Sequence, residues 1–276
     1  MKVGILIKVD EYPSPYEAIA INAKLGFDNG QLSIWDMSLY SDDVIAEIKR
    51  ACKDFNFTIT AVWCGWSGPV VWPYPNGYLT LGLVPAEYRA QRVQEILKGA
   101  DFAHALGVQD IITHIGFLPD NPFDRDHLGV VQSLRYICSR LKERDQYFLF
   151  ETGEELPLSL VYLFNDVGMD NLGVNFDPAN FILNGRGSHP VTTLKFLGRY
   201  VRGFHAKDAL QLVPPKCEKH EMPIGKGDVD FPGLIEVLRE YGYDGSLTIE
   251  REISGDQQLI DIRETQAYLQ DLIDQL

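Results

Sequence analysis

Four side chains that can bind a metal ion or transfer a proton each follow a short apolar stretch of the chain. They are Glu151, Asp177, His205 and Glu250. The apolar stretches before them are residues 147–150, 172–176, 201–204 and 246–249, and each is typical of a short buried β-strand. A single carboxylate in such a place is usually a helix cap or a surface charge. If the strands are parallel, however, their carboxyl ends meet at one edge and the side chains converge on one point.

This convergence predicts a divalent metal ion. Three carboxylates brought together without a cation would repel one another, and their protonation would require sharply raised pKa values. Carboxylate oxygen and imidazole nitrogen, without a thiolate, suit Mn²⁺, Mg²⁺, Co²⁺ or Zn²⁺ and leave coordination positions open for a substrate. Because most of the ligands are hard oxygens, the sequence favours Mn²⁺ among these ions.

Two further polar side chains lie next to the expected strand ends. His114 follows the stretch 110–113, where it would bind substrate, orient a carboxylate or simply pack against its neighbours. Lys207 falls on the same side of an extended chain as His205, which makes it a candidate for neutralising an oxyanion or a phosphate of the substrate. Asp208 is expected to brace a neighbouring loop.

Aromatic and basic residues lie in the two longest expected loops. Around residues 64–83 the aromatic group is Trp63, Trp66, Trp72 and Tyr74. It suits the apolar face of a sugar ring, although packing of a lid or a subunit contact would explain it equally well. The loop at 209–230 contains Lys216, Lys219 and Lys226. It falls near the usual phosphate region of a barrel, but solvated loop lysines are the commoner case.

Eight strand-like stretches alternate with helix-like ones along the chain. The four strands before the one at 147–150 are expected at 2–9, 31–34, 57–63 and 110–113. The helices are expected at 13–25, 41–55, 85–106, 124–143, 158–167, 192–197, 231–241 and 256–276. The alternation implies parallel pairing, and eight units in about 250 residues predict a single (β/α)8 TIM barrel over residues 1–276. An open doubly wound sheet is disfavoured, because Val-Asp-Glu-Tyr-Pro at 9–13 replaces its glycine-rich fingerprint.

Composition narrows the classes of partner. The chain has 276 residues, of which 45% are hydrophobic and 23% are charged, as in an ordinary soluble enzyme. Its net charge of −14, with scattered Lys and Arg, argues against a nucleic-acid partner. The absence of a signal peptide, of an apolar run of membrane-spanning length and of a Cys-x-x-Cys pair predicts a reduced cytoplasmic protein with no membrane partner. A homo-oligomer is left open.

Several motifs in the second half of the chain resemble one family. They are ETGE at Glu151, NFDPANF around Asp177, GFHAKDA around His205 and PIGKGDVDFPGLIEVLREYGYDGSLTIERE ending near Glu250. These motifs are similar to the xylose-isomerase-like TIM-barrel superfamily of sugar-phosphate isomerases and epimerases. The resemblance implies that the same four side chains are metal ligands, and that Glu151 and Glu250 also act as acid/base groups.

The chain departs from the better-known ketose 3-epimerases of that superfamily at two positions. Those enzymes carry a substrate-binding histidine three residues after the aspartate ligand and an arginine six residues after the histidine ligand. Here these positions hold Asn180 and Gln211. Asn180 can still form a hydrogen bond with a substrate hydroxyl, but it cannot act as a cation.

The combined reading predicts proton transfer next to a carbonyl group. A metal bound to a carbonyl oxygen and the adjacent hydroxyl would stabilise the enediolate formed on deprotonation, while two opposed carboxylates move the proton. We therefore expect a metal-dependent isomerase or epimerase of a small-molecule carbohydrate: a sugar, polyol or sugar phosphate. A dehydratase of the inosose or dehydroshikimate type is the alternative. A non-catalytic sugar- or metal-binding barrel and an endonuclease IV-like nuclease are less favoured, since the former needs no opposed glutamates and the latter needs more histidines.

Overall fold

Parallel strands close into a barrel at the centre of the molecule. The computed structural model describes residues 1–72, 76–184, 189–210 and 221–275. The barrel strands are β1 (Lys2–Lys8), β2 (Asn29–Ile34), β3 (Thr58–Cys64), β4 (Asp110–Thr113), β5 (Tyr147–Glu151), β6 (Leu172–Phe176), β7 (Val201–Ala206) and β10 (Ser246–Ile249). Their order is β1-β10-β7-β6-β5-β4-β3-β2, with β1 pairing in parallel to both β10 and β2. The predicted (β/α)8 barrel is therefore confirmed.

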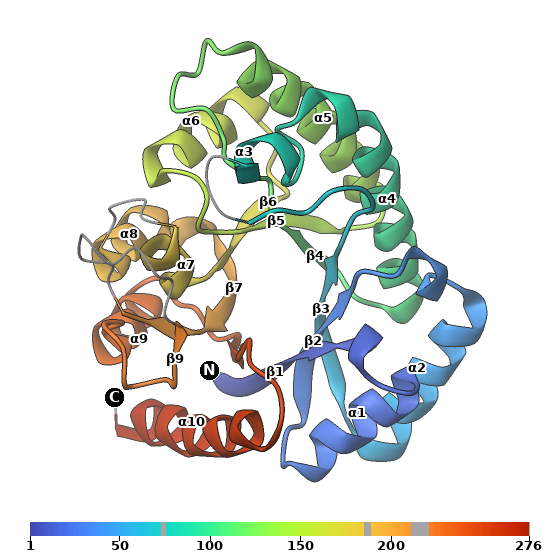
Figure 1. The fold of residues 1–276 in the computed structure, drawn as a ribbon, viewed down its shortest axis with the longest axis vertical. Helices are drawn as coiled ribbons and strands as arrows, with labels where there is room; N and C mark the ends of the chain where they lie inside the picture. Colours follow the sequence, from blue (N-terminus) through green and yellow to red (C-terminus); the bar gives the residue numbers. More distant parts are fainter. Residues whose placement is uncertain (73–75, 185–188, 211–220, 276) are drawn as a thin grey trace.

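Helices form a ring outside the strands (Figure 1). Those that return the chain between barrel strands or close it are α1 (Pro15–Lys24), α2 (Asp42–Phe55), α4 (Ala86–Leu106), α5 (Arg125–Lys142), α6 (Pro157–Val167), α8 (Pro190–Leu197), α9 (Phe231–Glu240) and α10 (Asp256–Gln275). Polar caps explain several of the starts. The side chain of Ser41 accepts a hydrogen bond from the backbone N–H of Val44, and that of Asp230 accepts one from Gly233. In the described parts of the chain, no helix is long and apolar enough to cross a membrane.

Several short elements between the strands and the main helices were not predicted. They are α3 (Asn76–Thr80), α7 (Pro178–Leu183), β8 (Asp208–Ala209), β9 (Glu221–Met222) and the 3₁₀ turns η1 (Val9–Glu11), η2 (Met37–Leu39) and η3 (Gly198–Tyr200). The sequence at α7 explains its start, because Asp177 caps the helix and Pro178 occupies its first position. Strand β7 runs two residues beyond its predicted end at 204, so that His205 lies within the strand rather than after it.

The loop after β7 is held by one carboxylate. The Asp208 side chain accepts hydrogen bonds from the backbone N–H groups of Gly225, Gly227 and Val229 at 2.9, 2.9 and 3.1 Å. The expectation that Asp208 braces a neighbouring loop is therefore confirmed. Tyr74, Gln211, Lys216 and Lys219, which the sequence analysis singles out, lie outside the described residues.

Candidate metal centre and active site

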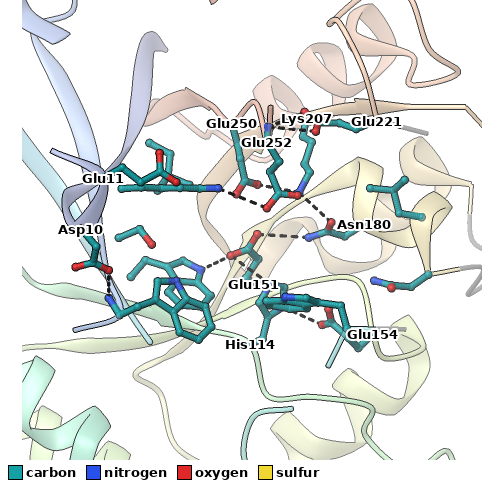
Figure 2. Close-up of a pocket in the computed structure, with 18 residues that line it drawn as sticks. Asp10, Glu11, His114, Glu151, Glu154, Asn180, Lys207, Glu221, Glu250 and Glu252 are labelled. Carbon is teal, nitrogen blue, oxygen red and sulfur yellow. Dashed lines mark hydrogen bonds and ion pairs between the residues drawn. The ribbon is translucent and has the colours of Figure 1, made fainter. Parts of the chain in front are cut away.

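A cavity of about 520 Å³ opens at the carboxyl ends of the strands, which is a size suited to a small molecule. Charged and aromatic side chains from most of the barrel strands line it (Figure 2). Lys8 comes from β1, Trp63 from β3, Glu151 from β5 and Glu250 from the end of β10. The closed barrel therefore directs residues distant in sequence into one space.

Glu151, Asp177, His205 and Glu250 meet beside this cavity. Each offers one ligand atom, and these atoms lie within 4.8 Å of one another. The residues belong to β5, β6, β7 and β10 or directly follow them, and these strands are neighbours in the barrel. All four are buried, and Asp177 and His205 are completely so. The geometry has the convergence that the strand-end pattern predicts.

The imidazole of His205 lies between the two glutamates. Its Nδ1 is 3.0 Å from Glu151 Oε1 and 3.3 Å from Glu250 Oε2. Burial would lower the pKa of His205, but the two carboxylates outweigh it and raise that pKa well above its ordinary value. On its far side, Nε2 lies 2.7 Å from Gln31 Oε1, and Gln31 in turn donates to Asn175 Oδ1 at 3.0 Å.

Asp177 supplies the test of whether the cluster fits a cation. One of its oxygens accepts the backbone N–H of Asn180 at 3.0 Å, whereas Oδ2 is buried and has no hydrogen-bond partner. Burial raises the pKa of Asp177 well above its usual range, even though Lys207 lies 3.8 Å from Oδ2. An orphaned carboxylate oxygen among two further carboxylates and an imidazole is the donor set that a divalent metal ion requires. The residues therefore fit such an ion.

Lys207 lies among carboxylates on the cavity wall. Its Nζ is 2.7 Å from Glu252 Oε2 and 3.2 Å from Glu250 Oε2. Burial would lower the pKa of Lys207, but these carboxylates raise it well above its ordinary value. The ammonium is thus already paired. Asn180 also lines the cavity, with its side-chain amide 3.4 Å from both Glu151 Oε1 and Lys207 Nζ.

His114 lies on the other side of Glu151. Its Nδ1 is 2.8 Å from Glu154 Oε2, and its Nε2 is 3.6 Å from Glu151 Oε2. Burial would lower the pKa of His114, but Glu154 and Glu151 raise it to about 10. Of the alternatives left open for His114, orientation of a carboxylate matches these contacts, and the residue also lines the cavity.

Tryptophan rings form one wall of the cavity. Trp35, Trp63 and Trp72 line it, and the centroids of Trp35 and Trp63 are 5.0 Å apart. The Trp63 indole N–H donates to Glu151 Oε2, which ties the wall to a candidate ligand. Trp66 is not among the described residues that line the cavity: its ring packs against Trp35, and the guanidinium of Arg92 lies over it.

The sequence analysis missed several residues of the site. They are Gln31, Trp35, Glu154, Asn175, Glu221 and Glu252. Trp35 directly follows β2, so the strand-end pattern that identified Glu250 would also have found it. Gln31 and Asn175 carried a weaker signal, as polar residues inside apolar strands. Lys226, one of the candidates for phosphate binding, is exposed and does not line the cavity.

Comparisons with solved structures show extensive likeness. A xylose isomerase domain protein from Planctomyces limnophilus is 32% identical and superposes with a TM-score of 0.90 over 98% of this chain and 96% of that one. A D-tagatose 3-epimerase-like protein is 19% identical, with a TM-score of 0.78 over 100% and 99% of the two chains. A xylose isomerase-like TIM barrel protein from Mycobacterium smegmatis in complex with magnesium is 17% identical, with a TM-score of 0.74 over 98% and 96%.

Curated relatives align over shorter stretches. Protein MJ1311 of Methanocaldococcus jannaschii is 30% identical over 96 residues, which are 35% of this chain and 31% of that protein. The match thus spans only about a third of that relative. An inosose dehydratase of Lacticaseibacillus casei is 23% identical over 185 residues, covering 56% of this chain and 61% of the enzyme.

A family model confirms the resemblance found in the motifs. The model, described as xylose isomerase-like TIM barrel, matches residues 19–272. That range runs from α1 to α10 and contains all four residues of the candidate metal centre. Because the match covers nearly the whole chain, the protein belongs to the xylose isomerase-like TIM barrel family.

Proposed function

We propose that this protein is a metal-dependent isomerase or epimerase acting on a small sugar, polyol or sugar phosphate. The reaction moves a proton on a carbon next to a carbonyl group. The observation that carries the proposal is the meeting of Glu151, Asp177, His205 and Glu250 within 4.8 Å beside a cavity of small-molecule size. The likeness to a D-tagatose 3-epimerase-like protein supports it.

These four side chains would hold one divalent metal ion. When bound, the ion would polarise the substrate carbonyl and offset the negative charge that develops on its oxygen. Mn²⁺ remains our preferred ion because three of the four donors are hard carboxylates. The magnesium complex of the Mycobacterium smegmatis protein supports a divalent ion of this class.

Glu151 and Glu250 are the proposed proton carriers. Burial would raise both pKa values, but His205 lowers the pKa of Glu151, and Lys207 with His205 lowers that of Glu250 well below its usual range. Both carboxylates are therefore ionised and able to accept a proton at neutral pH. One removes the proton from the substrate carbon. The other, which contacts the same His205 nitrogen, completes the return of a proton to carbon or oxygen.

Solvent exchange tests this proposal. The purified protein is incubated with Mn²⁺ and a panel of ketoses, inososes and sugar phosphates in D₂O, and NMR follows deuterium entry at one carbon. We expect Glu151→Gln and Glu250→Gln each to lower the exchange rate at least about 100-fold, as loss of a general acid/base group does. Glu264→Gln, an exposed change on α10 that does not line the cavity, serves as control and keeps the rate. Near-normal exchange in either cavity variant would contradict its assigned role.

Dehydration of the same kind of substrate is the second candidate. The observation that favours it is His114, whose pKa is raised to about 10 and which therefore carries a proton beside the cavity. Such an imidazolium can protonate a departing hydroxyl group after the carbon has been deprotonated. The likeness to inosose dehydratase supports this reading. Product mass separates the candidates, because an isomerase conserves it and a dehydratase removes one water.

A further inference from the structure

Carboxylates dominate the described wall of the cavity. Those that line it are Asp10, Glu11, Glu151, Glu154, Glu221, Glu250 and Glu252. The described basic residues of the lining are Lys8, Lys207 and His114. Even without the two proposed metal ligands Glu151 and Glu250, five carboxylates and three basic residues line the cavity, so acidic groups outnumber basic ones on the surface that a substrate meets.

The basic groups of this wall already have acidic partners. The Lys207 ammonium lies 2.7 Å from Glu252 and 3.2 Å from Glu250. Lys8 is 3.8 Å from the same Glu252, and His114 is 2.8 Å from Glu154. An anionic substrate would have to displace a carboxylate from one of these pairs. Glu250 and Glu154 are buried and would then lack a partner, whereas the exposed Glu252 would return to solvent.

Two carboxylates at the mouth of the cavity have no basic partner among the described residues. Asp10 and Glu11 form no ion pair with the residues that the structure describes, and Figure 2 places both across the cavity from Asn180. Within the described parts of the chain, the hydrogen bond of Asp10 is the one it accepts from the backbone N–H of Trp35, at 2.7 Å. A phosphate or carboxylate group that approached this side would meet like charge, which costs affinity and slows the encounter.

The rest of the wall suits an uncharged ligand. Trp35, Trp63 and Trp72 line the cavity, and aromatic rings pack well against the C–H groups of a sugar or cyclitol ring. The carboxylates beside them are hydrogen-bond acceptors for hydroxyl groups, which donate without bringing negative charge. Neutral polyhydroxylated molecules therefore match both surfaces.

We propose that the cavity selects a carbohydrate that carries neither a phosphate nor a carboxylate group. The inference rests on the proposed function for the existence of a carbohydrate substrate, and it narrows that substrate to an uncharged ketose, glycoside or cyclitol ketone. It excludes sugar phosphates and sugar acids, which the chemistry of the metal centre alone would admit.

Matched pairs of compounds test the selection. The Mg²⁺-loaded protein is given D-fructose and D-fructose 6-phosphate, D-tagatose and its 6-phosphate, and scyllo-inosose and 3-dehydroshikimate. Deuterium exchange and saturation-transfer NMR measure turnover and binding separately. We expect the uncharged member of the best pair to exceed its charged partner by about 100-fold or more, the scale set by several like charges facing one another.

Substitution of a carboxylate at the mouth of the cavity tests what causes the preference for the uncharged compound. Glu11→Gln is expected to narrow the preference for the uncharged member severalfold by lowering the KM or dissociation constant of the charged one. Glu264→Gln removes the same charge from α10, outside the cavity, and leaves the preference as it is. An unchanged preference in Glu11→Gln would show that the mouth carboxylate does not cause it and would overturn the argument.

The outcomes also separate this inference from the proposed function. Binding of uncharged members without any exchange supports the selection and contradicts the proposed reaction. Exchange on a charged member as fast as on its partner overturns the selection and keeps the reaction. Binding of a charged member alone, or of no compound in the panel, overturns the selection.

Discussion

The two carboxylate oxygens of Asp177 have different surroundings. It caps α7 through one oxygen, while the other oxygen is buried without a hydrogen-bond partner. A bound cation would give the buried oxygen a partner, so Asp177 links metal binding to the stability of the fold. The same link explains why a helix cap and a metal ligand need not be alternative readings of one aspartate.

Metal removal should therefore lower stability in a way that depends on Asp177. At a free Mn²⁺ concentration about 100 times the dissociation constant, the wild type should gain about 2.7 kcal/mol in free energy of unfolding. In Asp177→Asn most of that gain should disappear, because a neutral amide is a weak metal ligand. Urea unfolding with Mn²⁺ and with a chelator measures both. Equal gains in the two proteins would exclude Asp177 from the ligand set.

Glu155 offers a pH-dependent test away from the metal ligands. It is completely buried, and burial together with the nearby Glu154 raises its pKa to about 8. The unfolded chain releases this proton near pH 4, so the folded state alone keeps it between there and pH 8 and loses stability as the pH rises. Glu155→Gln removes this loss.

We expect the gain of Glu155→Gln to depend on pH. The variant should match the wild type near pH 4.5 and exceed it by a few kcal/mol at pH 8, since each unit of pKa shift corresponds to about 1.4 kcal/mol. Urea unfolding at the two pH values measures the difference, with the exposed Glu236→Gln as control. A gain that does not change with pH would mean that Glu155 is ionised in the folded protein.

At the scale of strands, a polar chain crosses the inside of the barrel. His205 on β7 contacts Gln31 on β2, and Gln31 contacts Asn175 on β6. The Gln31 carbonyl oxygen is an acceptor only, so His205 Nε2 must carry hydrogen and Nδ1 is left facing Glu151 and Glu250. The second strand thus fixes which imidazole nitrogen is available to a metal ion.

Gln31→Leu should weaken metal binding without touching a ligand. We expect about a 10- to 100-fold loss of Mn²⁺ affinity, the usual effect of removing a hydrogen-bond partner of a metal-binding histidine. Gln31→Glu retains an acceptor oxygen and should keep more of the affinity. In the Mg²⁺-loaded protein, the ¹⁵N chemical shifts of the His205 ring report the tautomer directly. Unchanged shifts in Gln31→Leu would show that Gln31 acts only in packing.

Strand positions and the four candidate ligands could be predicted because each depends on local sequence. An apolar run ending in Glu151 or Glu250 shows both the strand and the side chain that it delivers. Contacts across the barrel, such as Gln31 with His205, join residues 174 positions apart, and no local pattern contains them. The aromatic residues show the same limit: residue type alone does not say that Trp63 lines the cavity while Trp66 packs against Arg92.

At the scale of the whole molecule, closure of the barrel makes every strand pair depend on the others. β1 pairs with both β2 and β10, so the first and last strands hold the ring shut. A closed sheet has no free edge at which one strand can separate alone. A substitution that weakens the pairing of β1 with β2 or β10 should therefore lower the stability of the entire barrel.

Gly30 lies where β2 pairs with β1, and its substitution should destabilise the barrel as one unit. A Cβ there would come within 2.4 Å of the Ile5 backbone oxygen and 3.2 Å of the Phe57 ring, so that β1 and β2 must move apart. We expect Gly30→Ala to cost at least about 2–3 kcal/mol, in the range of overpacked cores. Gly107→Ala meets open space and costs only the strain of its φ of +81°, about 1 kcal/mol.

Whether the closed barrel unfolds as one unit can be tested separately from the stability that Gly30→Ala loses, by comparing two unfolding signals. Tryptophan fluorescence reports the mouth, where Trp35, Trp63 and Trp72 lie, and far-ultraviolet circular dichroism reports the helices and strands as a whole. If the closed barrel unfolds cooperatively, both signals in Gly30→Ala should shift together to lower urea concentration, because one cooperative unit loses stability. Separate transitions in the two signals would instead mean that the first strands can leave while the candidate metal centre on β5, β6, β7 and β10 stays folded.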